Sequence, residues 1–446
     1  MSRETYCEGI ATYTSTGKTT IHAFDGDVTF ISATKNRWSG KEDGITEHNY
    51  VAPEKKEEEA KKTSKETVKE IELLTDLNDG SANDQSGGLQ KGMIFGKSYQ
   101  FKVKSYAEET PKDKSVIKWM LKYHSLSENK WIEIPLALKG DTVKITMNEE
   151  DICGRFAYIR AYINDSETEG ELKVWKHNRF RWFDRMIVEE EIKERTDDKK
   201  PWLVNQAGTS LCGMACIFYL FAKEKPNEYK KFVKELFRTG EATLNKYTVK
   251  PSEDLFKKET KMQMVKGKNI TSAKSTGGMP LVDFVTMAGT RNTDNSSYKG
   301  GDEMIQAINW PPLMIELCEK LLGYDDVSSK GVYNPIKPLI YTSYDIKVKI
   351  EDINKQIRSG YRLILMIDAD LIDDVSDMSS LDLHWVVLES EIKEVQMLNK
   401  NSSIDYELDF SVYTWGTEPF GTTKYLKAPI SKKHFINNYN GYVKVK

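Results

Sequence analysis

The hydrophobic pattern changes from a period of two residues to a period of 3.6 residues near residue 177, and this change constrains the fold more than any other feature. After it, residues 214–223 and 226–238 carry apolar side chains at helical spacing, and 361–368 is typical of a buried strand. Before it, apolar and polar residues alternate in short segments that indicate strands, at 98–106, 117–123, 131–134, 142–147, 156–164 and 172–175. The pattern therefore predicts all-β parts followed by an α+β domain.

Composition divides the chain further. Residues 1–50 are strand-like, and Gly9, Gly17 and Gly26 head successive segments, which is typical of a β-spike rung or of a β-meander with glycine turns. Residues 51–91 join a Glu/Lys-rich half to a Gly/Ser-rich half, so we predict a linker without a packed core. The strand count of residues 92–177 favours an immunoglobulin-like sandwich, and residues 178–446 form the α+β domain.

Charge and cysteine content exclude several classes of protein. The chain has 446 residues with 65 Lys and Arg against 68 Asp and Glu, so net charge gives no reason to expect nucleic acid or a membrane surface as a partner. Five cysteines, at 7, 153, 212, 216 and 318, are too scattered for a disulfide scaffold. We predict no membrane span, and the first residues lack the apolar core of a secretory signal, so we expect synthesis in the cytoplasm and export, if any, by a machine that reads no such signal.

Two segments contain the candidate catalytic residues: Gln206-Ala-Gly-Thr-Ser-Leu-Cys212 and His384-Trp-Val-Val-Leu. Ser210 is predicted to cap the helix that follows, which places Cys212 in the first turn, where the helix dipole lowers the pKa of a thiol. His384 opens a predicted strand and is the candidate base. Cys216 lies four residues after Cys212, and with no metal-ligand cluster nearby we interpret it as a core cysteine.

A Gln six residues before a Cys, with a distant His, resembles the papain-like cysteine peptidases over roughly residues 202–415, and Cys-Gly-Met-Ala is most similar to their bacterial peptide-processing and toxin branches. The resemblance implies a papain-like fold for 178–446, with Cys212 as nucleophile, His384 as base and Gln206 as oxyanion donor. It implies neither a cofactor nor a metal.

The residue that would orient His384 departs from the family. Asp409-Phe-Ser-Val-Tyr-Thr-Trp-Gly resembles the Asn-Ser-Trp-Gly stretch of papain-like enzymes, but a Tyr stands in place of the Asn. Alternation predicts that Tyr413 and Trp415 share one strand face and that Thr414 lies on the other. The side chains of Tyr413, Thr414, Asp409 and Glu418 all remain candidates, as does a backbone carbonyl, and the Trp is expected to shield the Cys–His pair from water.

Residues 1–50 also resemble the spike repeats of contractile injection machines such as type VI secretion systems, and the sandwich resembles spacer modules of secreted effectors. Together these resemblances imply a bacterial effector toxin with a cysteine peptidase or amidase domain. Its partners would be a protein, peptide or peptidoglycan substrate, the spike or tip proteins of the secretion machine, and a cognate immunity protein. Two alternatives stay open: a Cys-dependent acyltransferase or deamidase, and a non-enzymatic structural adaptor.

Overall fold

The computed structural model describes residues 66–125, 128–258, 278–301, 304–332, 343–372, 383–398, 404–419 and 429–446. Helices and strands contribute comparable shares, as expected for a mixed α/β chain with several sheets. The described residues form two compact units. The first unit comprises 66–71, Val103–Asp141 and Arg155–Lys173, and the second comprises Glu72–Lys102, Thr142–Gly154 and Val174–Lys446. The predicted spike-like segment, 1–50, lies outside the described residues.

Three antiparallel strands form the centre of the first unit: β5 (Lys118–Ser125) lies between β6 (Lys130–Lys139) and β8 (Arg155–Tyr162). In this register Leu121 pairs with Ile134 on one side and with Ile159 on the other. The short 3-10 helix η1 (Lys114–Val116) precedes β5, and β1 (Val68–Leu73) begins in this unit. Strands are present where they were expected at 117–123, 131–134 and 156–164, although β5 is buried on both faces from Trp119 to Ser125 rather than on one.

The predicted linker is wrong for residues 68–91. Val68 of β1 is buried against Gly170, where an added Cβ would come within 2.6 Å of the valine. In the second unit β2 (Asn78–Ser81) pairs with β3 (Leu89–Ile94), which runs parallel to β9 (Glu171–His177). β4 (Ser98–Tyr106) pairs there with β7 (Thr142–Thr146), and η2 (Glu150–Ile152) follows. The immunoglobulin-like arrangement of residues 92–177 stays a prediction.

The linker prediction failed because Gly80, like Gly92 just beyond the predicted linker, serves close packing rather than flexibility. A Cβ added to Gly80 would lie 2.8 Å from Cε1 of His177, and one added to Gly92 would lie 2.9 Å from Nε2 of the same ring. Glycine in a strand marks such a close approach. Composition alone does not distinguish this use from a flexible segment.

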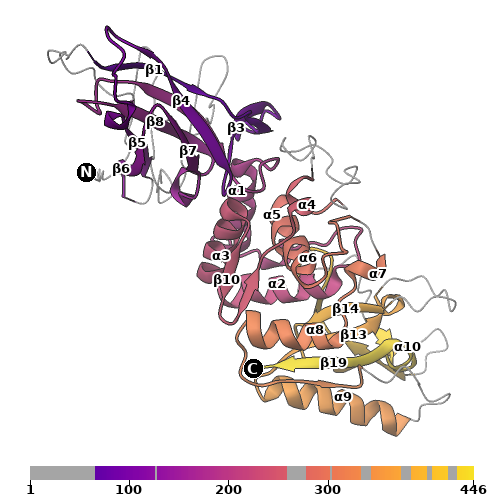
Figure 1. Cartoon of the computed structure of the whole chain (residues 1–446). Helices are drawn as coiled ribbons and strands as arrows, with labels where there is room; N and C mark the ends of the chain where they lie inside the picture. Colours follow the sequence, from indigo (N-terminus) through magenta and orange to yellow (C-terminus); the bar gives the residue numbers. More distant parts are fainter. Residues whose placement is uncertain are drawn as a thin grey trace, which may run out of the picture. The chain divides into compact units, whose positions relative to one another are not determined.

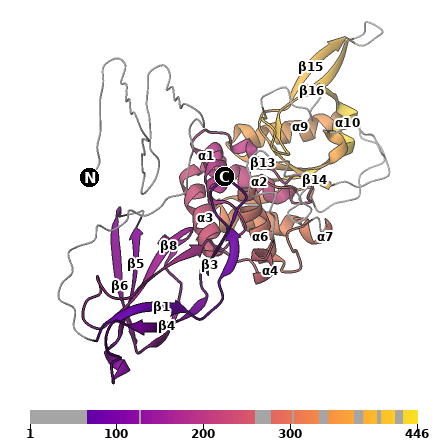
Figure 2. The same cartoon turned by 90° about the horizontal axis from the view of Figure 1, so that it is seen from above.

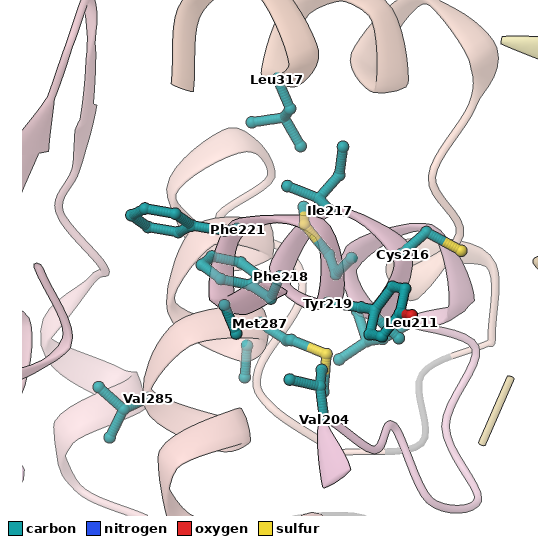
Figure 3. Packing of buried hydrophobic residues seen from close by; sticks show 14 of the residues in the cluster. Val204, Leu211, Cys216, Ile217, Phe218, Tyr219, Phe221, Val285, Met287 and Leu317 are labelled. Carbon is teal, nitrogen blue, oxygen red and sulfur yellow. The ribbon is translucent and has the colours of Figure 1, made fainter. Parts of the chain in front are cut away.

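Helix α2 (Cys212–Glu224) of the second unit, in which every residue from Cys212 to Ala222 is buried, packs against α1 (Arg185–Thr196), η3 (Pro201–Leu203), α3 (Pro226–Thr239) and the π-helix η6 (Phe284–Ala288). A helix that is apolar on all sides is expected at the centre of a domain. Figure 3 shows Phe218, Phe221 and Ile217 of α2 among Val285, Met287 and Leu317. The helical part of this unit also includes α4 (Glu253–Phe256), α5 (Leu281–Asp283), α6 (Gly289–Asp294), α7 (Met304–Ala307), α8 (Pro311–Glu316) and the π-helix η7 (Leu317–Leu321). A short hairpin joins β10 (Ala242–Leu244) to β11 (Tyr247–Val249).

A five-stranded antiparallel sheet completes the second unit, in the order β12 (Val327–Lys330), β19 (Tyr439–Val445), β13 (Arg362–Asp368), β14 (Leu383–Leu388) and β17 (Val412–Tyr413). α9 (Ser343–Arg358) covers one face, and α2 packs on β14 from the other (Figure 1). Figure 2 shows the hairpin of β15 (Lys393–Leu398) and β16 (Ile404–Asp409) projecting from this sheet. The remaining elements are η8 (Ala369–Leu371), β18 (Ile430–Ser431) and α10 (Lys432–Asn438).

Candidate active site

Cys212 is the first residue of α2, as predicted, but the predicted cap is wrong. The N-cap residue is Leu211, which makes no side-chain capping bond, so Ser210 lies one position too early. Cys212 retains 8% exposure. Its sulfur is therefore attached at the positive end of the helix dipole, the position that favours a thiolate.

Gly213 brings the first turn of α2 against Asn309. A Cβ at this glycine would lie 2.6 Å from the Asn309 Cβ and 2.6 Å from the Met314 sulfur. The backbone carbonyl oxygen of the same asparagine accepts a hydrogen bond from Nε1 of Trp385, 3.0 Å away. Because Trp385 follows His384 in β14, Asn309 links the start of the Cys212 helix to the start of the His384 strand. Nothing in the sequence around Asn309 predicted this role.

The imidazole of His384 is buried, with 5% exposure, and its Nε2 lies 2.8 Å from Oγ1 of Thr414. The ring of Trp415 stacks on it at a centroid distance of 4.4 Å and an interplanar angle of 22°. Burial lowers the pKa of His384 to about 3, so the imidazole is neutral at pH 7. One nitrogen of this neutral imidazole can still accept a proton, but a pKa near 3 makes it a weak base unless a nearby negative charge stabilises the imidazolium.

Of the four candidates to orient His384, Thr414 is the one in contact with it. The Tyr413 hydroxyl instead donates to the carbonyl oxygen of Val204 at 2.5 Å, and its ring stacks on Tyr219 at 3.8 Å. Asp409 pairs with Lys393 in the β15–β16 hairpin, and Glu418 is exposed. Tyr413 therefore anchors β17 to the segment before Gln206.

Trp415 does not follow the predicted alternation, because the strand has ended before it. Its φ is 43° and that of Gly416 is 70°, both in the left-handed region. The resulting turn is closed by a bond from the Thr417 N–H to the Thr414 carbonyl at 3.0 Å. Thr414 and Trp415 consequently both reach the imidazole, although strict alternation would place them on opposite faces.

Gln206 is buried and its amide Nε2 donates to the carbonyl oxygen of Thr209 at 2.7 Å. The Thr209 hydroxyl returns a bond of 2.7 Å to the Gln206 carbonyl, so the turn before α2 is held closed. A carboxamide nitrogen carries two hydrogens, and the bond to Thr209 uses one of them. The amide can therefore donate a second bond, as an oxyanion donor must.

The Gln206 turn and the Trp415 turn lie against one another. A Cβ at Gly416 would come within 2.8 Å of Nδ2 of Asn205, the residue that precedes Gln206. These contacts join neighbours of the three predicted residues: Gly416 lies against Asn205, and Trp385 and Gly213 both contact Asn309. Along β14, His384 shares a face with Val386 and Leu388, whereas Trp385 and Val387 face α2.

Cys216 lies in the core with 1% exposure, and burial raises the pKa of its thiol. Across the described ranges, no group of three His, Cys, Asp or Glu residues is arranged to hold a metal ion. A depression of about 500 Å³ lies at the opposite end of α2, beside Lys223, Glu224 and Arg362. It contains none of the three candidate residues, so the site rests on their contacts.

Comparisons with family models, with curated proteins and with solved structures find no match to this chain. In the part of the chain that the structure describes, no helix combines the length and the apolar character needed to span a bilayer. The functional argument therefore depends on the site.

Proposed function

We propose that this chain is a cysteine hydrolase that cleaves an amide or related acyl bond through Cys212, His384 and Gln206. The observation that carries the proposal is the His384–Thr414–Trp415 arrangement: a buried imidazole bonded at Nε2 and covered by an indole, on the strand whose next residue is tied to the Cys212 helix. A base held by a third group is what a thiol nucleophile requires.

In the proposed mechanism Thr414 Oγ1 accepts the Nε2 proton of His384, which leaves Nδ1 as the basic nitrogen. Nδ1 takes the thiol proton as the Cys212 sulfur attacks the acyl carbon, and the imidazolium later protonates the leaving amine. Burial keeps the imidazole neutral beforehand, and the thiolate that forms on Cys212 stabilises the imidazolium as the proton moves. Trp415 keeps water from the pair during the proton transfer.

The tetrahedral intermediate places negative charge on the former carbonyl oxygen. The second amide hydrogen of Gln206 and the backbone N–H of Cys212, at the positive end of α2, stabilise that charge. Collapse of the intermediate gives a thioester at Cys212, and water then releases the acyl group.

The biological setting is proposed on the sequence resemblances: a secreted bacterial effector whose substrate is a protein, a peptide or peptidoglycan, blocked in the producing cell by an immunity protein. The same Cys–His pair would serve an acyltransferase or a deamidase, because the acceptor decides the product. Mass spectrometry of the products distinguishes these reactions.

We expect Cys212→Ala to abolish both acyl transfer and toxicity, because no other group replaces the sulfur. Acylation by p-nitrophenyl acetate, followed by the release of p-nitrophenol, measures the first, and growth of cells that express the chain measures the second. Cys216→Ala is the matched control, because this thiol is four residues away on the same helix and buried in the core. Equal acylation of the Cys212→Ala and Cys216→Ala variants would contradict the proposal and favour a non-enzymatic adaptor.

A further inference from the structure

Three consecutive residues immediately before Gln206 are each held by a buried side chain from a different element. Arg195 of α1 donates from Nη2 to the Leu203 carbonyl at 3.0 Å, and the Tyr413 hydroxyl of β17 donates to the Val204 carbonyl. The backbone N–H of the next residue, Asn205, donates to Oδ2 of Asp283 in α5 at 2.9 Å. The backbone that leads into Gln206 is therefore fixed at three successive positions.

Two of these three side chains form a buried ion pair. Nη2 of Arg195 lies 2.7 Å from Oδ2 of Asp283, and the side chains are 2% and 0% exposed. The other Nη of Arg195 donates to the Glu191 carbonyl at 2.8 Å. Among the described residues, Nε of Arg195 and Oδ1 of Asp283 are buried without a hydrogen-bond partner.

An incompletely bonded buried ion pair is a poor source of stability. Removing two charges from water costs several kcal/mol for each ion, and the attraction repays this cost only when the remaining polar atoms are also satisfied. Asp283 is also followed directly by the π-helix η6, a type of distortion often found at functional sites. The pair therefore invites a role other than stability.

We propose that the Arg195–Asp283 pair is a positioning pair that sets the height and direction of the Gln206 amide at the oxyanion site. Arg195 fixes the carbonyl of Leu203 and Asp283 fixes the N–H of Asn205, so the two charges hold both ends of the segment that enters the Gln206 turn. This inference rests on the proposed function and adds two residues that do not touch substrate.

The pair is suited to this task because an oxyanion donor acts only at the correct distance. Loss of one such donor lowers kcat by roughly 10²–10³-fold, and a displacement of about 1 Å can cost about 10²-fold. A salt bridge that bonds to the backbone on both sides limits such displacement better than the turn's own Thr209 bond, which moves with Gln206.

The experiment measures two reactions of Cys212 on the full chain: acylation by p-nitrophenyl acetate and alkylation by iodoacetamide. Acylation passes through an oxyanion, whereas alkylation at a saturated carbon does not. The ratio of the two rates therefore reports the oxyanion donors and cancels any change in the folded fraction or in thiol reactivity. The Cys212→Ala variant supplies the background for both reactions.

We expect Asp283→Asn to lower this ratio by about 10-fold or more, and Gln206→Ala to lower it by about 10²-fold. In the Gln206→Ala background, Asp283→Asn should change the ratio by less than about twofold, since residues that act through one group are not additive. Arg195→Lys keeps the charge but loses the fork that reaches Leu203 and Asp283 together, so it should lower the ratio even if Asp283→Asn does not fold.

Asp184→Asn is the matched control, because Asp184 is an equally buried carboxylate that bonds to the backbone of Met186 and Gln85 instead. It should leave the ratio unchanged. If Gln206→Ala lowers the ratio but Asp283→Asn and Arg195→Lys do not, or if the two effects add, the positioning role is refuted and the hydrolase proposal stands. An unchanged ratio in Gln206→Ala refutes the oxyanion assignment itself, and this proposal with it.

Discussion

Two buried strand histidines of the second unit, His177 and His384, differ in how their ring nitrogens are used. In His177, Nδ1 accepts a bond from Nε1 of Trp175 at 3.2 Å and Nε2 lies 3.1 Å from the Asn78 carbonyl oxygen. In His384, Thr414 at Nε2 is the hydrogen-bond partner found among the described residues. A ring with both nitrogens engaged holds structure together, whereas a ring bonded at one nitrogen can exchange a proton at the other.

The packing of the two rings supports the same distinction. Gly80 and Gly92 lie against the ring of His177 so closely that neither position has room for a Cβ. His384 is covered on one face of its ring by the indole of Trp415, which stacks on it. Burial is therefore common to the two rings, and the pattern of hydrogen bonds is what distinguishes them.

The strongest way to break this comparison is to replace each ring by a glutamine. His384→Gln should lower the rate of Cys212 acylation by about 10²–10⁴-fold, because the general base is lost. His177→Gln should cost about 1–3 kcal/mol in the free energy of unfolding, through unsatisfied buried partners, and leave the acylation rate of the folded protein unchanged. p-Nitrophenyl acetate kinetics and urea denaturation of both variants check this. Similar rates in the two variants would remove His384 from the mechanism.

Patterns in the sequence predicted the helices and strands around the site well, but they predicted poorly which side chains contact one another. The strand that contains His384 follows from its β-branched and aromatic residues, and the helix after Cys212 follows from its apolar run; both signals depend only on neighbouring residues. The bond from His384 to Thr414 was one of four open alternatives, and alternation misplaced Trp415 because a left-handed turn follows the strand. Alternation predicts to which face of a sheet a side chain points only within a regular strand, and it makes no prediction for residues after the strand has ended.

The Arg195–Asp283 pair marks a different limit. Its members are 88 residues apart, and each alone reads as an ordinary charged residue of a helix. A charge pattern predicts pairs within a helix, at spacings of three or four residues, but not pairs between distant elements. The contacts of Asn309 were missed for the same reason: long-range partners are set by tertiary packing.

The second prediction concerns what the two histidines share, which is burial. Burial lowers the pKa of His384 to about 3 and that of His177 to about 4. The unfolded chain binds a proton at each ring below about pH 6.5, so the free energy of unfolding falls as pH decreases from 6.5, by about 1.4 kcal/mol per pH unit for each ring. Glu191 acts in the opposite direction, because burial raises its pKa to about 7 and its contribution is lost as pH rises from 4.5 to 7.

Each His→Gln variant removes one of the two histidine contributions and leaves Glu191 in place. Relative to the unsubstituted chain, the stability of either variant should therefore improve by about 2 kcal/mol between pH 6.5 and pH 5. Urea denaturation at the two pH values measures this difference. If the difference in unfolding free energy between His384→Gln and the unsubstituted chain were the same at both pH values, the His384 ring would be solvated. The two histidines would then not share burial, which the comparison assumes.

The smallest expected effect tests the hydrogen bond that distinguishes His384. Thr414→Val keeps the shape of the side chain but removes the Oγ1 atom that is bonded to Nε2 of His384. The tautomer and the orientation of the imidazole are then no longer fixed by this bond. We expect the acylation rate to fall by about 10-fold, the equivalent of one hydrogen bond of about 1.4 kcal/mol. Thr414→Ser should retain the rate, because it keeps the hydroxyl.

Glu418→Gln is the control among the four orienting candidates, since this carboxylate is exposed and the loss of its charge should change the acylation rate by less than about twofold. If Thr414→Val were as active as Thr414→Ser, the ring would be held by Trp415 alone, and the contrast with His177 would rest on packing rather than on hydrogen bonds.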